Sequence, residues 1–82
     1  MAELIQSYTE VVRDAGGEEY TVHAYGEPRA DGNWEGWIEF HSILGAVRRT
    51  NRETTQPNRE ALRYWATGLE PVYFDGAFAR AS

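Results

Sequence analysis

The sequence predicts an α+β domain: an antiparallel four-stranded meander with one or two C-terminal helices packed on one face of the sheet. Up to about residue 54, short apolar–polar alternating runs with a period of two are separated by glycine-containing turns. After residue 55 the apolar residues instead recur with the period of an amphipathic helix. The chain has 82 residues, which provide for one core, so residues 1–82 are expected to form a single domain.

The clearest strand pair joins residues 18–26 to residues 34–43. A two-residue Asp-Gly turn between them would mix the apolar and polar faces of the two strands. A three-residue loop with Gly32 in the left-handed conformation instead pairs Val22 with Phe40, and the apolar faces then agree. This bulged turn also sets the register of the opposite face and brings two glycines together on the core side, leaving room for a close contact. The expected pairs are Tyr25–Trp37, His23–Glu39, Thr21–His41, Ala24–Ile38 and Gly26–Gly36.

The first segment has two interpretations. Residues 8–13, followed by Asp14-Ala15-Gly16-Gly17, are typical of a strand and a turn. Apolar residues within 4–12 also match a helical stripe, with Gly16 as its C-cap. The β-branched content and the double glycine favour the hairpin, and residues 4–13 stay open between strand and helix. Residues 47–54 are polar and predict a fourth strand at an edge of the sheet.

The C-terminal third predicts helix. Thr55-Gln56-Pro57 has a capping hydroxyl and a first-turn proline. Gly68 is the expected C-cap of this helix. Residues 72–81 form either a second short helix or, over Val72–Phe74, a final strand. The expected apolar stripe of the first helix is Leu62, Trp65 and Leu69, widened by Ala61 and Tyr64. The expected core comprises Val22, Trp34, Ile38, Phe40, Leu62 and Trp65.

Composition excludes several protein classes. There are 13 acidic and 8 basic residues and no cysteine, which excludes a disulfide-stapled miniprotein, a zinc finger and a globally basic nucleic-acid binder. No apolar run is long enough to span a membrane, and no apolar leader occurs in residues 1–20, so a cytoplasmic location is expected. Residues 1–41 carry nine acids and two arginines (−7), and residues 42–82 carry four acids and six arginines (+2). The two halves are expected to complement each other within the molecule.

No motif supports enzymatic chemistry. Asp31, Asn33 and Glu35 match the start of a calcium loop, but position 12 of that loop is Ser42 and the segment already predicts a strand. His23 and His41 share a face with Glu39, an arrangement that more often forms hydrogen bonds than holds a metal. A cysteine or elbow-serine nucleophile and a glycine-rich phosphate loop are both missing. We therefore expect a non-enzymatic protein without cofactor or metal.

The expected working surface is the sheet face away from the helices. Tyr25 and Trp37 form an aromatic pair there, flanked by two histidines. Such pairs are typical of protein hot spots and of platforms on which RNA bases stack, and the N-terminal segment or the chain's end could instead cover them. A protein partner or self-association is the first expectation, and single-stranded nucleic acid is the second because this half of the chain is acidic. The candidate contact residues are Tyr25, Trp37, His23 and His41, with Arg48, Arg49 and Arg52 adding charge along the edge strand.

Two resemblances accompany these residues. The runs at 31–40 (DGNWEGWIEF), 52–57 (RETTQP) and 64–69 (YWATGL) resemble short bacterial proteins that have no assigned activity. This resemblance implies a compact family and transfers no catalytic residue. More loosely, Tyr20-Thr21-Val22, the Asp-Gly turn and the later helix resemble HicB-like antitoxin domains, which implies an antitoxin-type regulator as an alternative function. The chain departs from that pattern because it lacks an evident DNA-binding segment, and fold analogy alone does not license a function.

Overall fold

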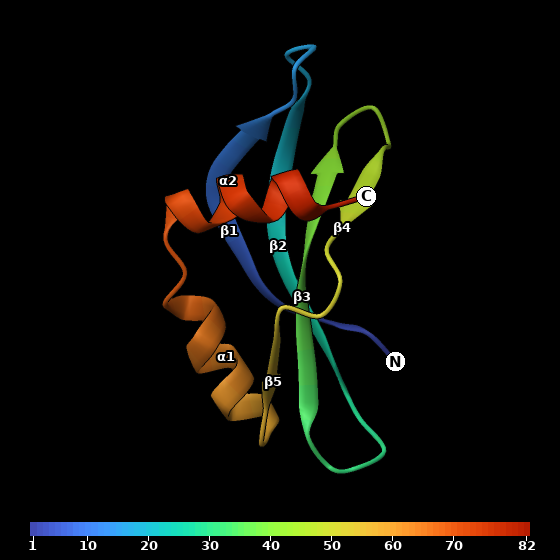
Figure 1. Ribbon diagram of the computed structural model, residues 1–82, viewed down its shortest axis with the longest axis vertical. Coiled ribbons are helices and arrows are strands. Elements are labelled where there is room, and N and C mark those ends of the chain that lie inside the picture. Colours follow the sequence, from blue (N-terminus) through green and yellow to red (C-terminus); the bar gives the residue numbers. More distant parts are fainter.

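The computed structural model describes residues 1–82 and contains one five-stranded antiparallel sheet and two helices (Figure 1). Strands β1 to β4 follow one another in the sheet in chain order, and β5 also pairs with β3. Both helices follow the strands in the chain, which confirms the α+β class. The elements are β1 (Glu3–Arg13), β2 (Glu19–Pro28), β3 (Trp34–Ser42), β4 (Val47–Arg49), β5 (Thr54–Gln56), α1 (Arg59–Thr67) and α2 (Pro71–Arg80).

The β2–β3 hairpin has the predicted register. Gly32 adopts a φ of 89°, and the Arg29 N–H donates to the Asn33 carbonyl at 2.7 Å across the predicted three-residue loop. The stretch that matched the start of a calcium loop is therefore a β-turn and a strand. All expected cross-strand pairs occur: Val22–Phe40, Ala24–Ile38, Tyr25–Trp37, His23–Glu39, Thr21–His41 and Gly26–Gly36.

β1 is a strand, so the helical interpretation of residues 4–13 is wrong. It pairs with β2 along its whole length, with irregular register between Leu4 and Gln6 and between Ser7 and Val11. A strand lets Ile5 and Val12 reach the core from one edge of the sheet. The Tyr8 hydroxyl then donates to the carbonyl of Ala66 in α1 at 2.6 Å, which joins sheet and helix.

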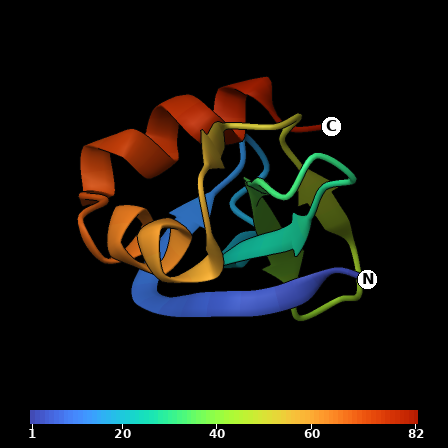
Figure 2. The same cartoon turned by 90° about the horizontal axis from the view of Figure 1, so that it is seen from below.

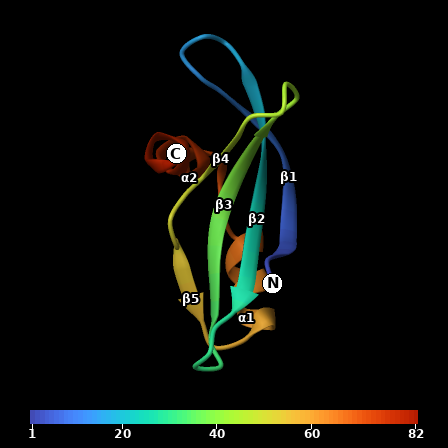
Figure 3. The same ribbon diagram turned by 90° about the vertical axis from the view of Figure 1, so that its right-hand side faces the viewer.

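The expected single strand over residues 47–54 is wrong. The chain forms β4, leaves the ladder, and returns as β5 along the same strand β3 (Figure 3). The break is caused by polar groups that bind inward. Thr50 is fully buried, and its backbone N–H and hydroxyl oxygen both bond to the Ile38 backbone. The Glu53 carboxylate accepts hydrogen bonds from the Tyr73 hydroxyl and from Arg80, so the polar segment anchors α2.

α1 begins later than predicted. Residues Thr54–Gln56 form β5 and pair with β3, so Thr55 cannot cap the helix. Asn58 is the N-cap instead, and its side-chain oxygen accepts the Ala61 N–H at 2.8 Å. Gly68 ends the helix as predicted. The following segment is helical from Pro71 to Arg80, which decides the second open choice in favour of helix.

Replacing Asn58 with alanine is expected to destabilise the fold by about 1 kcal/mol, because the Ala61 N–H loses its acceptor. The free energy of unfolding in urea measures the loss. Thr55→Ala is the matched control, since it removes the hydroxyl of the predicted cap that forms no cap here. A larger loss in Thr55→Ala than in Asn58→Ala would contradict the assignment.

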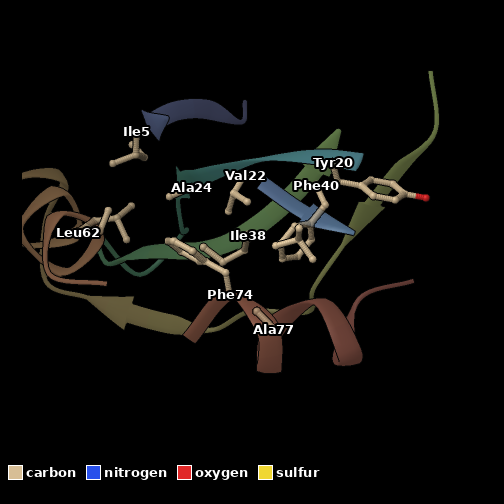
Figure 4. Close-up of a cluster of buried hydrophobic side chains, with 11 residues drawn as sticks. Ile5, Tyr20, Val22, Ala24, Ile38, Phe40, Leu62, Phe74 and Ala77 are labelled. Carbon is tan, nitrogen blue, oxygen red and sulfur yellow. The ribbon is translucent and has the colours of Figure 1, made fainter. Parts of the chain in front are cut away.

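The core lies between the sheet and the two helices, which cover the same face (Figures 2 and 4). Cβ atoms placed on Gly26 and Gly36 would lie 2.3 and 2.6 Å from the methyl groups of Leu62, so the room left by the glycine pair is filled by α1. The buried stripe of α1 consists of Leu62 and Ala66, which face the sheet. Tyr64 is exposed because it lies on the side of α1 that faces away from the sheet. Of the expected core, Val22, Ile38, Phe40 and Leu62 are fully buried, whereas Trp34 and Trp65 pack at its margin.

Ion pairs join the acidic and basic halves of the chain. Glu3 of β1 pairs with Arg59 of α1, and Asp14 lies 3.8 Å from Arg48 of β4. Other ion pairs, such as Arg13–Glu19 and Arg80–Glu53, lie within one half, so the complementarity expected from the charge distribution is met only in part. Neither helix is both long and apolar enough to cross a membrane.

Candidate functional site

The helix-free face of the sheet carries the predicted site. It is defined by three rows of side chains that run across the strands, opposite to the core residues Val22, Ile38 and Phe40. The first row is Leu4–Tyr25–Trp37, the second is Ser7–His23–Glu39–Arg49, and the third is Val11–Thr21–His41–Val47. The predicted register therefore brings Tyr25, Trp37, His23 and His41 together on one surface.

Trp37 is not exposed on this face, contrary to expectation: only 1% of its surface reaches solvent. The Arg49 guanidinium lies 4.1 Å from the ring centroid, and the indole N–H donates to Glu39 Oε2 at 2.9 Å. Tyr25 stacks beside it, with ring centroids 6.5 Å apart. The chain's end is not the cover, because Ser82 pairs with the backbone of Arg49 at the outer edge of β4. Side chains of the face itself contribute this cover.

The two histidines form a close pair beside Glu39. Their ring centroids are 4.7 Å apart, and His41 Nε2 lies 2.9 Å from Glu39 Oε1. A carboxylate only accepts hydrogen bonds, so His41 Nε2 carries a proton. The carboxylate of Glu39 thus joins the imidazole of His41 to the indole of Trp37, one oxygen to each ring.

The hydrogen bonds of His23 hold it in the neutral form. The Thr21 hydroxyl donates to the His41 carbonyl at 3.2 Å, so it accepts the Nε2–H of His23 at 2.8 Å. The Ser7 hydroxyl is left to donate to His23 Nδ1 at 3.0 Å. Both ring nitrogens of neutral His23 are therefore satisfied.

Burial and the neighbouring His41 lower the pKa of His23, and Glu39 opposes them in part. The unfolded chain takes up this proton first, near the free imidazole value of about 6.5. Neutral His23 accordingly contributes stability above that pH, and the contribution is lost as pH falls through its folded pKa.

The three candidate arginines do not form one patch. Arg48 points to the helix side, where its guanidinium lies 4.7 Å from the Phe78 ring and 5.3 Å from the Tyr20 ring. Arg49 lies on the helix-free face over Trp37. Arg52 is exposed in the segment between β4 and β5. Successive residues of a strand point to opposite faces, so Arg48 and Arg49 are separated by the sheet.

Exposed aliphatic side chains surround the site, and the sequence interpretation missed them. Leu4, Val11 and Val47 lie at the ends of the rows, each about half exposed. Ile43 and Leu44 are almost fully exposed in the turn between β3 and β4. The adjacent Ile43-Leu44 pair beside Gly45 was the available signal, because two aliphatic residues are unusual in a tight turn.

No group of three or more His, Asp or Glu side chains is arranged to hold a metal ion. The hollow of about 420 Å³ at the β2–β3 loop is lined chiefly by polar residues such as Glu27, Arg29 and Glu35. It lies away from the histidine pair. Comparison of the chain with protein-family models, curated proteins and solved structures finds no match.

Proposed function

We propose that the protein is a non-enzymatic interaction module that binds a partner protein through the helix-free face of its sheet. The observation that carries this proposal is the distribution of exposed apolar side chains. Of the eight large hydrophobic residues that are exposed, five lie on this face or in the adjoining β3–β4 turn: Leu4, Val11, Ile43, Leu44 and Val47. Exposed apolar residues gathered on one surface are typical of protein contact sites.

The side chains at the centre of the helix-free face are held in fixed positions, which also favours protein binding. The Trp37–Glu39–His41 hydrogen bonds and the stacked Arg49 hold the centre of the surface before any partner arrives. A preordered surface loses less conformational entropy on binding. The exposed aliphatic residues at its margins supply apolar contact area around this polar centre.

The charge of the face disfavours nucleic acid as the partner. Its strand positions carry four glutamates and two arginines, a net charge of −2 with neutral histidines. Phosphate backbones are bound by basic surfaces. Burial of Trp37 also removes one ring of the stacking platform. The charged residues of the face are Glu19, Glu27, Glu35, Glu39, Arg13 and Arg49.

A double variant, Leu4→Ser/Val47→Ser, tests the proposal because it removes apolar contact at both ends of the rows without touching the core. Affinity capture from bacterial lysate, with and without nuclease, is expected to recover a nuclease-resistant protein with the wild type. Recovery should fall about tenfold or more with the double variant, since anchor residues each contribute about 1 kcal/mol or more.

The matched control is Tyr64→Ser/Val72→Ser, which removes two exposed apolar side chains from the helices instead. It is expected to recover the partner as the wild type does. Equal recovery by the face variant and the wild type would overturn the proposal. Nuclease-sensitive recovery would support the nucleic-acid alternative, and recovery of the chain itself would support self-association. Trp37 is unsuitable for this test because it is buried.

A further inference from the structure

The centre of the helix-free face contains two imidazole rings and an arginine around one carboxylate. His23 and His41 are in ring contact, His41 bonds to Glu39, and Arg49 faces Glu39 across the β3–β4 ladder. The remaining neighbours of the pair are neutral: Ser7 from β1, with Thr21 and Tyr25 from β2. Glu39 is thus the only anion in direct contact with the pair.

We propose that protonation of the His23–His41 pair in acid switches the helix-free face from a closed state to one in which Arg49 leaves Trp37 and the indole becomes accessible. A partner that fits the closed face at neutral pH is then released in acid. This last consequence rests on the proposed function, whereas the switch itself is a property of the free protein.

The charge balance of the cluster drives the change. With neutral imidazoles, one cation (Arg49) faces one anion (Glu39). With both imidazoles protonated, three cations surround the same carboxylate, whose two oxygens already accept from His41 and Trp37. Like charges at the 4.7 Å spacing of the rings repel each other, and Arg49 is the cation that can move to solvent most easily. Its guanidinium is held over the indole without a hydrogen bond of its own.

The hydrogen bonds of His23 favour the closed state at neutral pH. A second ring proton must enter at Nδ1, where the Ser7 hydroxyl now donates. The hydroxyl has to turn and become an acceptor, so the existing network resists protonation until the solution is acidic. The lowered pKa of His23 likewise means that its protonation needs a more acidic solution.

The test follows the indole N–H resonance of Trp37 by NMR in the free protein, with a neutral soluble gadolinium chelate as the probe of accessibility. The resonance is assigned from its loss in Trp37→Phe. Its paramagnetic relaxation enhancement is expected to rise at least threefold between pH 7 and pH 5, in step with the titration of the two imidazole Cε1–H signals. The indole signals of Trp34 and Trp65, on the opposite face, should stay constant and serve as internal controls.

His23→Gln keeps a side chain able to bond to Ser7 and Thr21 but cannot be protonated, so it is expected to abolish most of the rise. His41→Gln provides a second variant with the same expectation if the first is poorly folded. Glu60→Gln, an exposed change on α1, should behave as the wild type does.

An unchanged Trp37 enhancement in the wild type, or an undiminished rise in both histidine variants, would overturn the switch. A simultaneous rise at all three indoles would also overturn it, since that pattern reports global acid unfolding. These outcomes are independent of the capture experiment. Loss of the partner by Leu4→Ser/Val47→Ser at neutral pH supports the proposed function even if the switch fails.

Discussion

Gly26→Ala is expected to destabilise the fold by about 3 kcal/mol or more, the upper end of overpacking effects. A Cβ atom at this position would lie 2.3 Å from a methyl group of Leu62 and 2.9 Å from the backbone carbonyl of Glu35. The leucine can change rotamer, but the carbonyl belongs to the neighbouring strand β3 and can move only with it. The free energy of unfolding in urea measures the effect.

Gly36→Ala is the graded comparison for Gly26→Ala. Its Cβ would lie 2.6 Å from Leu62 and 3.2 Å from Thr54, both side-chain atoms, and no closer than 3.5 Å to a backbone atom. We expect a smaller loss, relieved in a double variant with Leu62→Ala. Gly76→Ala, in the open interior of α2, should instead be stabilising by up to about 1 kcal/mol. An equal or larger loss at Gly36 than at Gly26 would contradict the role of the carbonyl.

Phe40→Ala is expected to cost about 3–5 kcal/mol and to leave no more than about 2 kcal/mol of stability at room temperature, because small domains have a total stability of about 5 kcal/mol. Phe40 is fully buried at the centre of the sheet and contacts the Phe78 ring edge-to-face at 5.0 Å. Removal of its ring leaves a cavity between sheet and α2. Chemical denaturation followed by circular dichroism reports the loss.

The control for Phe40→Ala is Ile43→Ala, three residues along the chain in the β3–β4 turn. Ile43 is 89% exposed, so its truncation should change stability by no more than about 0.5 kcal/mol. A loss below about 1 kcal/mol for Phe40→Ala would contradict the assignment of this residue to the core. The two variants thus compare the truncation of a buried side chain with that of an exposed side chain three residues away.

The central hairpin was predictable because two local rules agreed there. Alternation in residues 18–26 and 34–43 fixed the faces, and only a loop with a left-handed Gly32 kept both apolar faces together. The same register rule places His23 opposite Glu39 from the sequence alone, as the structure has it. Where no such constraint acted, as between strand and helix in residues 4–13, local pattern left the choice open.

The sequence predicted which aromatic and histidine residues share the helix-free face, but it did not predict that Trp37 is buried there. Strand parity decides the face of Trp37, but its cover comes from Arg49 on another strand and from Glu39 two residues away. Strand parity also places Arg48 and Arg49 on opposite faces of the sheet, so the two arginines do not form one charged edge. Side-chain cover depends on where long polar groups find partners, and periodicity does not encode that.

By itself, the sequence determined the α+β class, the register of β2 and β3 and the C-cap at Gly68, because turn chemistry and hydrophobic period are local properties. Tertiary contacts decided the split of the fourth strand, the start of α1 and the burial of Trp37. The Thr50 side chain bonds to the Ile38 backbone, the pairing of β5 with β3 moves the start of α1 to Asn58, and Arg49 of β4 covers the ring of Trp37. Buried and terminal polar groups must find partners, and only the folded chain determines which ones are within reach.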